Sequence, residues 1–480
     1  MNRIATLFSI FLILTGCGNK TLNKQESVIN EIISNLDDGE LNKAFILADS
    51  LKNKSIKGSE LFMKTDSLAQ IAERIAVDFS LDENEVISQL EKRSGSYSVD
   101  EKEKWDKSGL LEYRIINGRK MYFNRAVSNL MLLRKSVNPA VSGHIEDSSD
   151  YETSFRLRHT SEVMNESTGK TEPAVPVKMR ITYTITVKPD VVPEGEIVRC
   201  WLPWPRNDQP RHDSITLLAA SQPDYIIAPD SAIHSTIYME KPAQKGVPAV
   251  FQITYAYRSK GQYFNPDEIK AFSYDKESEV FRKFTSEQRP QIHFSEQVRK
   301  MADSIAGDEK DPRIIVRKIY LWFKENIPWS GAMEYSIMPD IPTYVLKNRR
   351  GDCGMQTFLF MSMVRSRGIP VRWQSGWMVP PSAENLHDWC EVYYEGTGWV
   401  PADVSYDLQP SKKQKVKLFY LTGIDAYRMI VNTGVSGQLY PGKIFLRSEP
   451  YDFQRGEVEW TGGNLYFDKW DYDIKIDYLN

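Results

Sequence analysis

The spacing of apolar residues changes along the chain and predicts two kinds of secondary structure. Between residues 27 and 135, apolar residues recur every three or four positions on a charged background, which is typical of amphipathic helices. From residue 178 onwards they alternate with polar residues in short runs between Pro, Gly and Asp turns, which is typical of a β-sandwich. The first pattern predicts helices over residues 27–36, 40–52, 59–78, 84–92 and 125–135. The second predicts strands over residues 178–187, 196–202, 216–219, 235–239 and 249–257.

The pattern becomes mixed after residue 290. Helices are expected over residues 295–305 and 311–326, and the second begins with Asp311 as N-cap and Pro312 in its first turn. The almost entirely apolar run from Met355 to Val364 predicts a helix that is buried on most sides. Further strands are expected over residues 428–433, 443–448, 457–461 and 471–478. They are too few to fold alone, so they should complete a sheet of a preceding domain.

These patterns predict an α+β multidomain protein, and 480 residues are enough for two to four domains. We expect a helical region over residues 17–147, a β-sandwich over 148–289 with strands from Phe155 onwards, a core over 290–415 and C-terminal strands over 416–480. The helical region either docks a protein partner or forms a plain cap on the domains behind it. The pattern does not choose between these roles.

The first 16 residues have the features of a secretory signal peptide. Arg3 supplies the positive charge, and the apolar run over residues 4–14 is too short to span a membrane. Leu14-Thr15-Gly16-Cys17 resembles a bacterial lipobox, which predicts lipidation of Cys17 and a membrane anchor without a spanning helix. The alternative is an ordinary cleaved signal with an incidental cysteine. No acidic residue follows in Gly18-Asn19-Lys20, so we expect a lipoprotein of the cell envelope on the periplasmic face of the outer membrane.

Cys353 lies at the predicted start of the buried helix. Gly351-Asp352 is a turn pair, and Asp is a residue type that caps helix N-termini. Gly368 and Pro370 predict the end of this helix. Unpaired N–H groups and the helix dipole favour an anion in the first turn, and a nearby imidazolium can lower a thiol pKa to about 3.5–7.5. We therefore expect Cys353 to be a nucleophilic thiolate at neutral pH.

A histidine and a carboxylate follow on a predicted hairpin. Residues 387–394 alternate like a strand, and a turn follows over residues 395–398. His387 and Asp403 each lie eight positions from residue 395 (395 − 387 and 403 − 395), so a hairpin centred there places them opposite each other. Asp403 would then hold one ring nitrogen of His387 while the other faces the thiol. A lone cysteine or histidine is usually structural, but three such positions in this order favour a catalytic site.

Four motifs together resemble the core of the transglutaminase-like superfamily, which has a papain-like cysteine fold. They are Gly351-Asp352-Cys353-Gly354, Arg365-Ser366-Arg367-Gly368-Ile369-Pro370-Val371-Arg372, His387-x-Trp389-x-Glu391-Val392-Tyr393 and Gly398-Trp399-x-x-x-Asp403. The resemblance implies that Cys353 is the nucleophile, His387 the general base and acid, and Asp403 the orienting carboxylate. Asp388 departs from the family pattern, where a small or apolar residue is more usual. We expect Asp388 to face outwards and to leave the triad intact.

The resemblance also implies that an aromatic residue ahead of the nucleophile can help to stabilise an oxyanion. Trp329 and Tyr335 are the candidates for substrate binding in this way. The alternative is that they form a groove wall without donating a hydrogen bond.

Charge and cysteine usage narrow the set of partners. The net charge of −3 argues against a nucleic-acid partner. The sequence contains no cluster with metal-ligand spacing and no calcium-loop pattern, so no metal or cofactor is expected.

Cys200 and Cys390 are expected to be buried free thiols rather than a disulfide. Cys390 lies three positions from His387 and should face the other side of its strand.

These features predict a membrane-anchored thiol enzyme that acts on amide bonds of peptides or proteins through an acyl-enzyme. We expect hydrolysis rather than cross-linking, because many bacterial proteins that this chain resembles look like peptidases or amidases. The alternative is a catalytically quiet lipoprotein scaffold that binds a peptide or a glycan.

Overall fold

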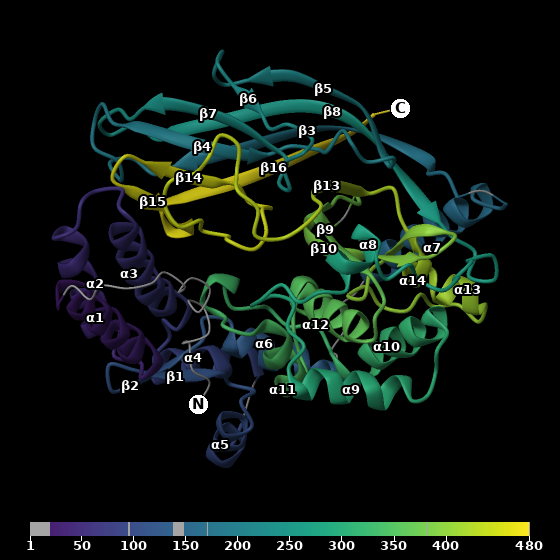
Figure 1. Ribbon diagram of the computed structural model, residues 1–480, viewed down its shortest axis with the longest axis horizontal. Helices are drawn as coiled ribbons and strands as arrows, with labels where there is room; N and C mark the ends of the chain where they lie inside the picture. The colour runs from purple at the N-terminus through teal and green to yellow at the C-terminus, as the bar shows by residue number, and fades with distance from the viewer. Residues whose placement is uncertain (1–19, 95–96, 138–147, 170, 382, 480) are drawn as a thin grey trace. The chain divides into compact units, whose positions relative to one another are not determined.

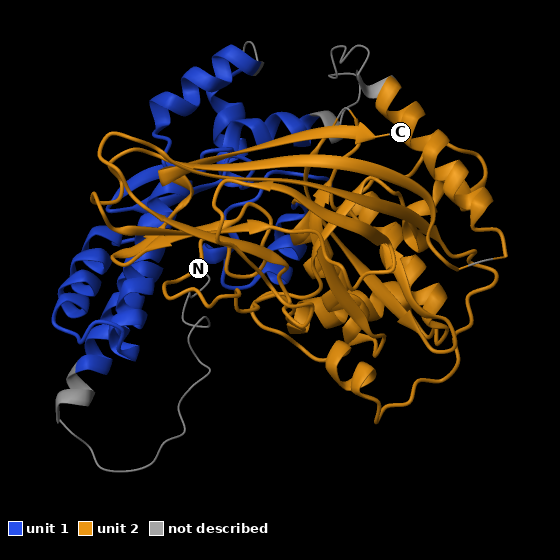
Figure 2. Cartoon of the chain, turned by 90° about the horizontal axis from the view of Figure 1, so that it is seen from above, with its two compact units in different colours: residues 1–143, 328–351 blue, residues 144–327, 352–480 orange. Residues whose placement is uncertain are grey.

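The computed structural model describes residues 20–94, 97–137, 148–169, 171–381 and 383–479, and its helices and sheets confirm the predicted α+β class (Figure 1). The signal segment and Cys17 lie outside the described residues. The chain divides into two compact units, which Figure 2 shows in different colours. Unit 1 consists of residues 1–143 and 328–351, and unit 2 of residues 144–327 and 352–480. Residues 328–351, which the sequence pattern assigned to the core, therefore belong to unit 1.

Unit 1 is mainly helical. Its helices are α1 (Lys20–Asp37), α2 (Leu41–Asn53), α3 (Glu60–Asp78), α4 (Glu83–Ser94), α5 (Val99–Lys107), α6 (Ala126–Val137), the 3-10 turn η3 (Tyr335–Ile337) and α11 (Ile341–Asn348). Their apolar stripes form a core that includes Ile32, Ala44, Leu68, Ile75 and Leu90. The five helices expected in this region are therefore present; α1 begins seven residues earlier than expected, and the other ends differ by at most two residues.

The sequence pattern missed a hairpin in unit 1. Strands β1 (Tyr113–Ile116) and β2 (Arg119–Tyr122) pair antiparallel around Asn117-Gly118, and both turn residues have positive φ angles (48° and 77°). Asn-Gly is the residue pair that two-residue hairpins of this geometry favour. The local signal was thus in the sequence, although the flanking strands are only four residues long.

Unit 2 contains the predicted sandwich, built from two five-stranded sheets. One sheet has the order β12-β8-β3-β16, with β5 also paired to β8, and the other has the order β15-β14-β4-β7-β6 (Figure 1). The strands are β3 (Ala174–Val187), β4 (Ile197–Pro203), β5 (His212–Ala220), β6 (Ile226–Ile227), β7 (Thr236–Pro242), β8 (Ala249–Tyr263), β12 (Gly423–Ile424), β14 (Glu457–Trp460), β15 (Gly463–Leu465) and β16 (Trp470–Leu479). Inward-facing residues such as Ile181, Trp201 and Phe251 form one buried cluster between the sheets.

The core of unit 2 is a four-stranded antiparallel sheet covered by helices. Its order is β11 (Gly398–Ala402), β10 (Asn385–Tyr394), β9 (Val371–Met378) and β13 (Arg428–Asn432). Helix α12 (Cys353–Ser366) packs on this sheet, and α9 (Glu296–Ala306) and α10 (Pro312–Asn326) pack on α12. Trp377 and Met429 of this sheet join the sandwich cluster, so the two layers share one interior. The C-terminal strands therefore complete both sheet systems, with β13 in the core and β14 and β16 in the sandwich.

Two predictions for unit 2 are wrong. The segment around Phe155 was expected to form strands but is helix α7 (Ser148–Glu166). Phe155, His159 and Val163 lie four positions apart and share one helix face, on which Val163 packs against Tyr263. Residues 443–448, expected to be a strand, are irregular.

The backbone N–H groups of this irregular stretch make hydrogen bonds to side chains instead of to a neighbouring strand. The N–H groups of Ile444 and Phe445 donate to the buried carboxylate of Glu459, and that of Ser448 donates to Glu457. These two glutamates are fully buried on β14. Side chains from a distant strand therefore replace the ladder hydrogen bonds that the alternating pattern had predicted.

Candidate active site

Cys353 is the first residue of α12, as expected. Asp352 is the N-cap, and its side chain accepts a hydrogen bond from the N–H of Met355 at 2.9 Å. The helix is buried almost throughout, and Phe358 stacks on Trp373 of β9 with ring centroids 4.2 Å apart. Gly368 follows the helix end with φ of +72°. The local sequence therefore fixes the thiol at the positive end of a rigid helix.

His387 and Asp403 form a buried pair. His387 Nε2 lies 2.7 Å from Asp403 Oδ2, so the expected contact is present. The predicted register was wrong, because Cys390 pairs with Ala402 and the hairpin is therefore centred one residue later than expected. Asp403 directly follows β11 and stands diagonal to His387 rather than opposite to it. A two-residue offset keeps both residues on the same face, which preserves the contact.

A cluster of donors holds Asp403 as an anion. Arg428 Nη1 donates to it at 3.0 Å, and Ser405 Oγ donates at 2.9 Å. Burial alone would raise the pKa of Asp403, but the charges of His387 and Arg428 outweigh it and lower the pKa below its usual value. Nδ1 of His387 has no hydrogen-bond partner among the described residues. This second ring nitrogen is therefore able to take up a proton.

The thiol of Cys353 contacts Asp388. Sγ lies 3.2 Å from Asp388 Oδ2, and no hydrogen bond joins the thiol to His387 among the described residues. Burial raises the pKa of Cys353 well above its usual value, and the charges of Asp388 and Asp352 raise it further. A hydrogen bond from the Asp388 backbone N–H acts in the opposite direction but does not outweigh them. The surroundings of the thiol in this arrangement therefore disfavour the thiolate that the sequence analysis expected.

Asp388 is not the outward-facing neighbour that the sequence predicted. Its side chain is only 3% exposed, and Gln454 Nε2 donates to its Oδ1 at 2.7 Å. Burial raises the pKa of Asp388 well above its usual value, and the neighbouring carboxylate of Asp452 adds to this. Asp452 in turn accepts hydrogen bonds from Ser375 and Asn432. Sequence analysis missed this network because Gln454 and Asp452 lie more than 60 positions from Asp388.

The remaining candidate residues are placed as follows. Trp329 and Tyr335 belong to unit 1, whereas Cys353 belongs to unit 2, so a role for either aromatic residue stays a prediction. Cys200 and Cys390 are buried and free, as expected. Within the described residues, no three or more His, Cys, Asp and Glu side chains gather as a metal site would require. A search of the same residues for a helix long and apolar enough to cross a membrane finds none.

Comparison with known protein families identifies a match to the segment that contains the candidate site. Residues 299–404 match the model of the Transglutaminase-like superfamily, which confirms the predicted resemblance over the segment that holds Cys353, His387 and Asp403. No curated protein sequence matches the chain.

Solved structures with a similar arrangement include a candidate cysteine protease from Cytophaga hutchinsonii (TM-score 0.41, 15% identity, 64% of this chain and 92% of that one). They also include the periplasmic domain of TgpA from Pseudomonas aeruginosa (TM-score 0.26, 14% identity, 52% and 93%). A third is a candidate protease from Parabacteroides distasonis (TM-score 0.19, 11% identity, 51% and 64%).

Proposed function

Since residues 299–404 form a transglutaminase-like core, we propose that this protein is a thiol enzyme that cleaves amide bonds of peptides or proteins. Cys353 is the nucleophile, His387 is the general base and acid, and Asp403 orients and stabilises the ring. The observation that carries this proposal is the buried His387–Asp403 pair, 2.7 Å apart, in the same segment as a cysteine in the first turn of α12. His387 and Asp403 thus make the contact that their roles require, and Cys353 lies in the first turn of a helix.

The reaction has two halves. The proton of Cys353 passes to Nδ1 of His387, and the sulfur attacks the amide carbon. The C–N bond then breaks, and the leaving amine takes the proton from the imidazolium, which leaves a thioester. Water attacks this thioester while His387 accepts its proton, and the acid product leaves with the thiol restored. Asp403 remains ionised throughout because Arg428 also pairs with it.

The first half requires the thiol to exchange partners. Its resting hydrogen bond is to Asp388, so the side chain of Cys353 must rotate towards His387 before the proton can move. Apo sites commonly show loose catalytic hydrogen bonds that tighten in the complex with substrate. Binding of a substrate carbonyl next to the thiol would break its hydrogen bond to Asp388 and allow this rotation.

The test is turnover of a glutamine-containing peptide in the presence of a tagged amine, with free acid and tagged product measured separately. We expect free acid to exceed tagged product, and Cys353→Ala to abolish both. His387→Ala should lower the rate by at least about 100-fold, the usual scale of general acid–base catalysis. Asp308→Asn, which removes an exposed charge in unit 2, is the matched control and should leave the rate unchanged. An excess of tagged product would instead identify a transferase.

A specific observation favours a second candidate, a catalytically quiet scaffold that binds a peptide or a glycan. The Cys353 thiol is hydrogen-bonded to a buried carboxyl group rather than to the imidazole, and its surroundings raise its pKa. Alkylation of Cys353 at pH 7 distinguishes the two functions. A rate no higher than that of a free thiol in the presence of substrate peptide, unchanged by His387→Ala, would support the scaffold and contradict the enzyme.

We also propose that the protein is a lipoprotein of the cell envelope on the periplasmic face of the outer membrane, anchored through Cys17. The supporting observation is the short apolar signal followed by Leu14-Thr15-Gly16-Cys17. Metabolic labelling with a fatty acid, compared between the wild type and Cys17→Ser, tests this directly. Absence of label from the wild type would contradict it.

A further inference from the structure

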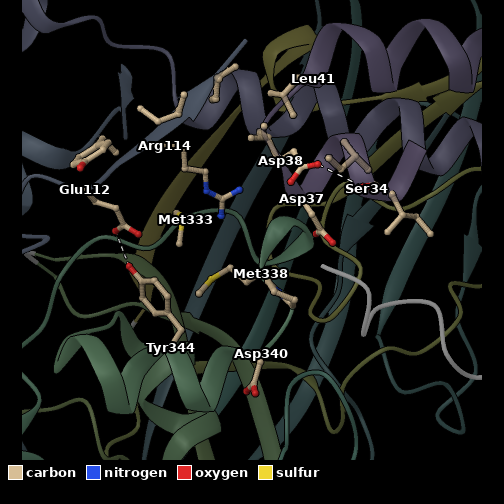
Figure 3. A pocket seen from close by; sticks show the side chains of 18 of the residues that line it. Ser34, Asp37, Asp38, Leu41, Glu112, Arg114, Met333, Met338, Asp340 and Tyr344 are labelled. Carbon is tan, nitrogen blue, oxygen red and sulfur yellow. Dashed lines mark hydrogen bonds between the residues drawn. The ribbon is translucent and has the colours of Figure 1, made fainter. Parts of the chain in front are cut away.

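Unit 1 contains a cavity of about 970 Å³ (Figure 3). It is bounded by the end of α1, by β1 and by the segment that carries η3 and the start of α11, and every residue that lines it belongs to unit 1. Ligand sites for small molecules typically measure about 300–1,000 Å³. The cavity is therefore at the upper end of this range and has room for more than a single amino acid.

Arg114 of β1 directs its guanidinium group into this cavity (Figure 3). The group lies over the ring of Phe79 at 4.6 Å, and Nη2 lies 4.0 Å from Met333 Sδ. Among the described residues, no carboxylate lies within ion-pair distance of it. The charges of Glu112 and Asp78 act on Arg114 from beyond that distance. A partly buried cation without a direct ion pair is costly, and the planar guanidinium group suits a carboxylate ligand.

The carboxylate on the same wall has other partners. Glu112 accepts a hydrogen bond from the hydroxyl of Tyr344 at 2.6 Å and another from Arg350 Nη2 at 3.2 Å. Figure 3 shows the Glu112–Tyr344 contact beside Arg114. Glu112 is therefore held in place by these two groups, and Arg114 remains available to an incoming anion.

The other side of the cavity is acidic. Asp37 and Asp38 lie at the C-terminal end of α1, where the helix dipole also favours a cation. Apolar side chains of Met333 and Met338 also line the cavity. The lining thus offers two basic side chains, Arg114 and Lys347, together with a group of carboxylates and apolar surface within a single cavity. A ligand that matches it carries an acid and an amine at separate ends.

We propose that this cavity binds a short peptide with both termini free. Its α-carboxylate pairs with Arg114, its ammonium group faces Asp37 and Asp38, and its side chains contact the two methionines. This inference concerns unit 1 alone, so it holds whether or not Cys353 is catalytic.

Calorimetric titration of the full-length protein tests the proposal with three probes: alanyl-leucyl-alanine, its C-terminal amide and its N-acetyl derivative. The free peptide should bind, and the amide should bind at least about tenfold more weakly, because a charge-assisted pair is lost. Arg114→Gln should lower the affinity for the free peptide to that for the amide, so that the variant no longer distinguishes the two. Asp38→Asn should lower the affinity for the free peptide more than the affinity for the N-acetyl peptide.

Arg119→Gln is the matched control, because Arg119 is an exposed arginine on β2 of the same hairpin and does not line the cavity. It should leave all three affinities unchanged, and thermal melting of each variant confirms that it is folded. If Arg114→Gln is unfolded, Arg114→Lys replaces it and should lower the affinity for the free peptide without removing the preference over the amide. The proposal is overturned if the wild type binds none of the probes at millimolar concentration or binds acid and amide equally. It is also overturned if inorganic phosphate displaces the peptide at equal concentration, which would indicate a general anion site.

Discussion

The thiol of Cys353 lies 3.2 Å from Asp388 Oδ2, and this contact determines the resting state of the candidate nucleophile. The carboxyl group follows directly after the candidate base on β10, and Gln454 holds it in place. When this carboxyl group is ionised, its negative charge at this distance disfavours a thiolate. Asp388 therefore opposes the effect of the helix N-terminus, which would otherwise lower the pKa of the cysteine.

Replacing Asp388 by Asn should activate the thiol. The amide has a similar shape but no negative charge, so the pKa of Cys353 should fall. A fall of one pKa unit increases the thiolate fraction about tenfold below the pKa. We therefore expect alkylation of Cys353 by iodoacetamide at pH 7 to accelerate about tenfold, measured by mass spectrometry of the peptide that contains it. Asp308→Asn is the control, and an unchanged rate in Asp388→Asn would show that Asp388 does not govern the thiol.

Replacing Arg428 by Ala should strongly destabilise unit 2. Arg428 is buried and pairs with Asp403 and Asp425, which are also buried. Its loss leaves two carboxylates without their cation, which costs about 3–5 kcal/mol in the free energy of unfolding. Urea denaturation followed by circular dichroism measures this change.

The matched control is Arg180→Ala, which removes an exposed arginine from its pair with Asp477. The arginine side chain is 46% exposed, so this pair should contribute only about 0–1 kcal/mol. Equal losses of stability in the two variants would contradict the buried-network interpretation.

Asp78 should make the stability of unit 1 depend on pH. Burial and the nearby charge of Glu334 raise the pKa of Asp78 to about 7, although Arg114 and Arg125 partly oppose this. Because the folded-state pKa is above the unfolded value, protonated Asp78 favours folding at low pH, and this contribution is lost as pH rises from about 4 to 7. Asp78→Asn cannot ionise and still accepts the Glu334 N–H, which Asp78 binds at 2.7 Å.

We therefore expect Asp78→Asn to be more stable than the wild type at pH 8, by on the order of 2–4 kcal/mol, and similar to it at pH 4. Urea denaturation at both pH values is the measurement. Glu103→Gln, at an exposed position on α5, is the control and should keep the pH dependence of the wild type. A variant with an unchanged pH dependence would show that Asp78 ionises normally.

Adding a methyl group at Gly376 should disrupt the sheet that carries the candidate base. Gly376 pairs with His387 on one side and with Ile430 on the other. A Cβ atom there would lie 2.0 Å from the carbonyl oxygen of Met429, a backbone atom that cannot move aside alone. Gly376→Ala should therefore lower the free energy of unfolding by roughly 1–3 kcal/mol or more, the usual cost of overpacking.

Gly463→Ala on β15 is the control, because a Cβ at that position meets no heavy atom within 4 Å. Thermal melting compares the two variants. Equal melting temperatures would contradict the close approach of β9 and β13 at Gly376.

The candidate triad could be predicted because its signals are local. A capping aspartate, an apolar run and a helix-ending glycine place Cys353 in the first turn of α12. Strand alternation places His387 and Asp403 on one face even though the predicted register was wrong by one residue at the hairpin centre. The family match over residues 299–404 confirms the core that these motifs indicated.

The electrostatic state of the thiol could not be predicted in the same way. Asp388 was expected to face solvent, because its burial depends on Gln454 and on the packing of C-terminal segments that no local pattern specifies. The same limit applies to the grouping of residues 328–351 with the N-terminal helices and to the cavity around Arg114.

The sequence by itself determined which residues begin helices, which alternate along strands and which carry the candidate chemistry, because capping and side-chain periodicity act over a few neighbouring positions. Only the tertiary structure decided what surrounds each charged group, because pKa values and ion pairs depend on side chains brought together from distant parts of the chain. For this protein, the sequence predicted a thiolate at the start of a helix, whereas the tertiary structure places a hydrogen-bonded carboxyl group, Asp388, beside the thiol and raises its pKa.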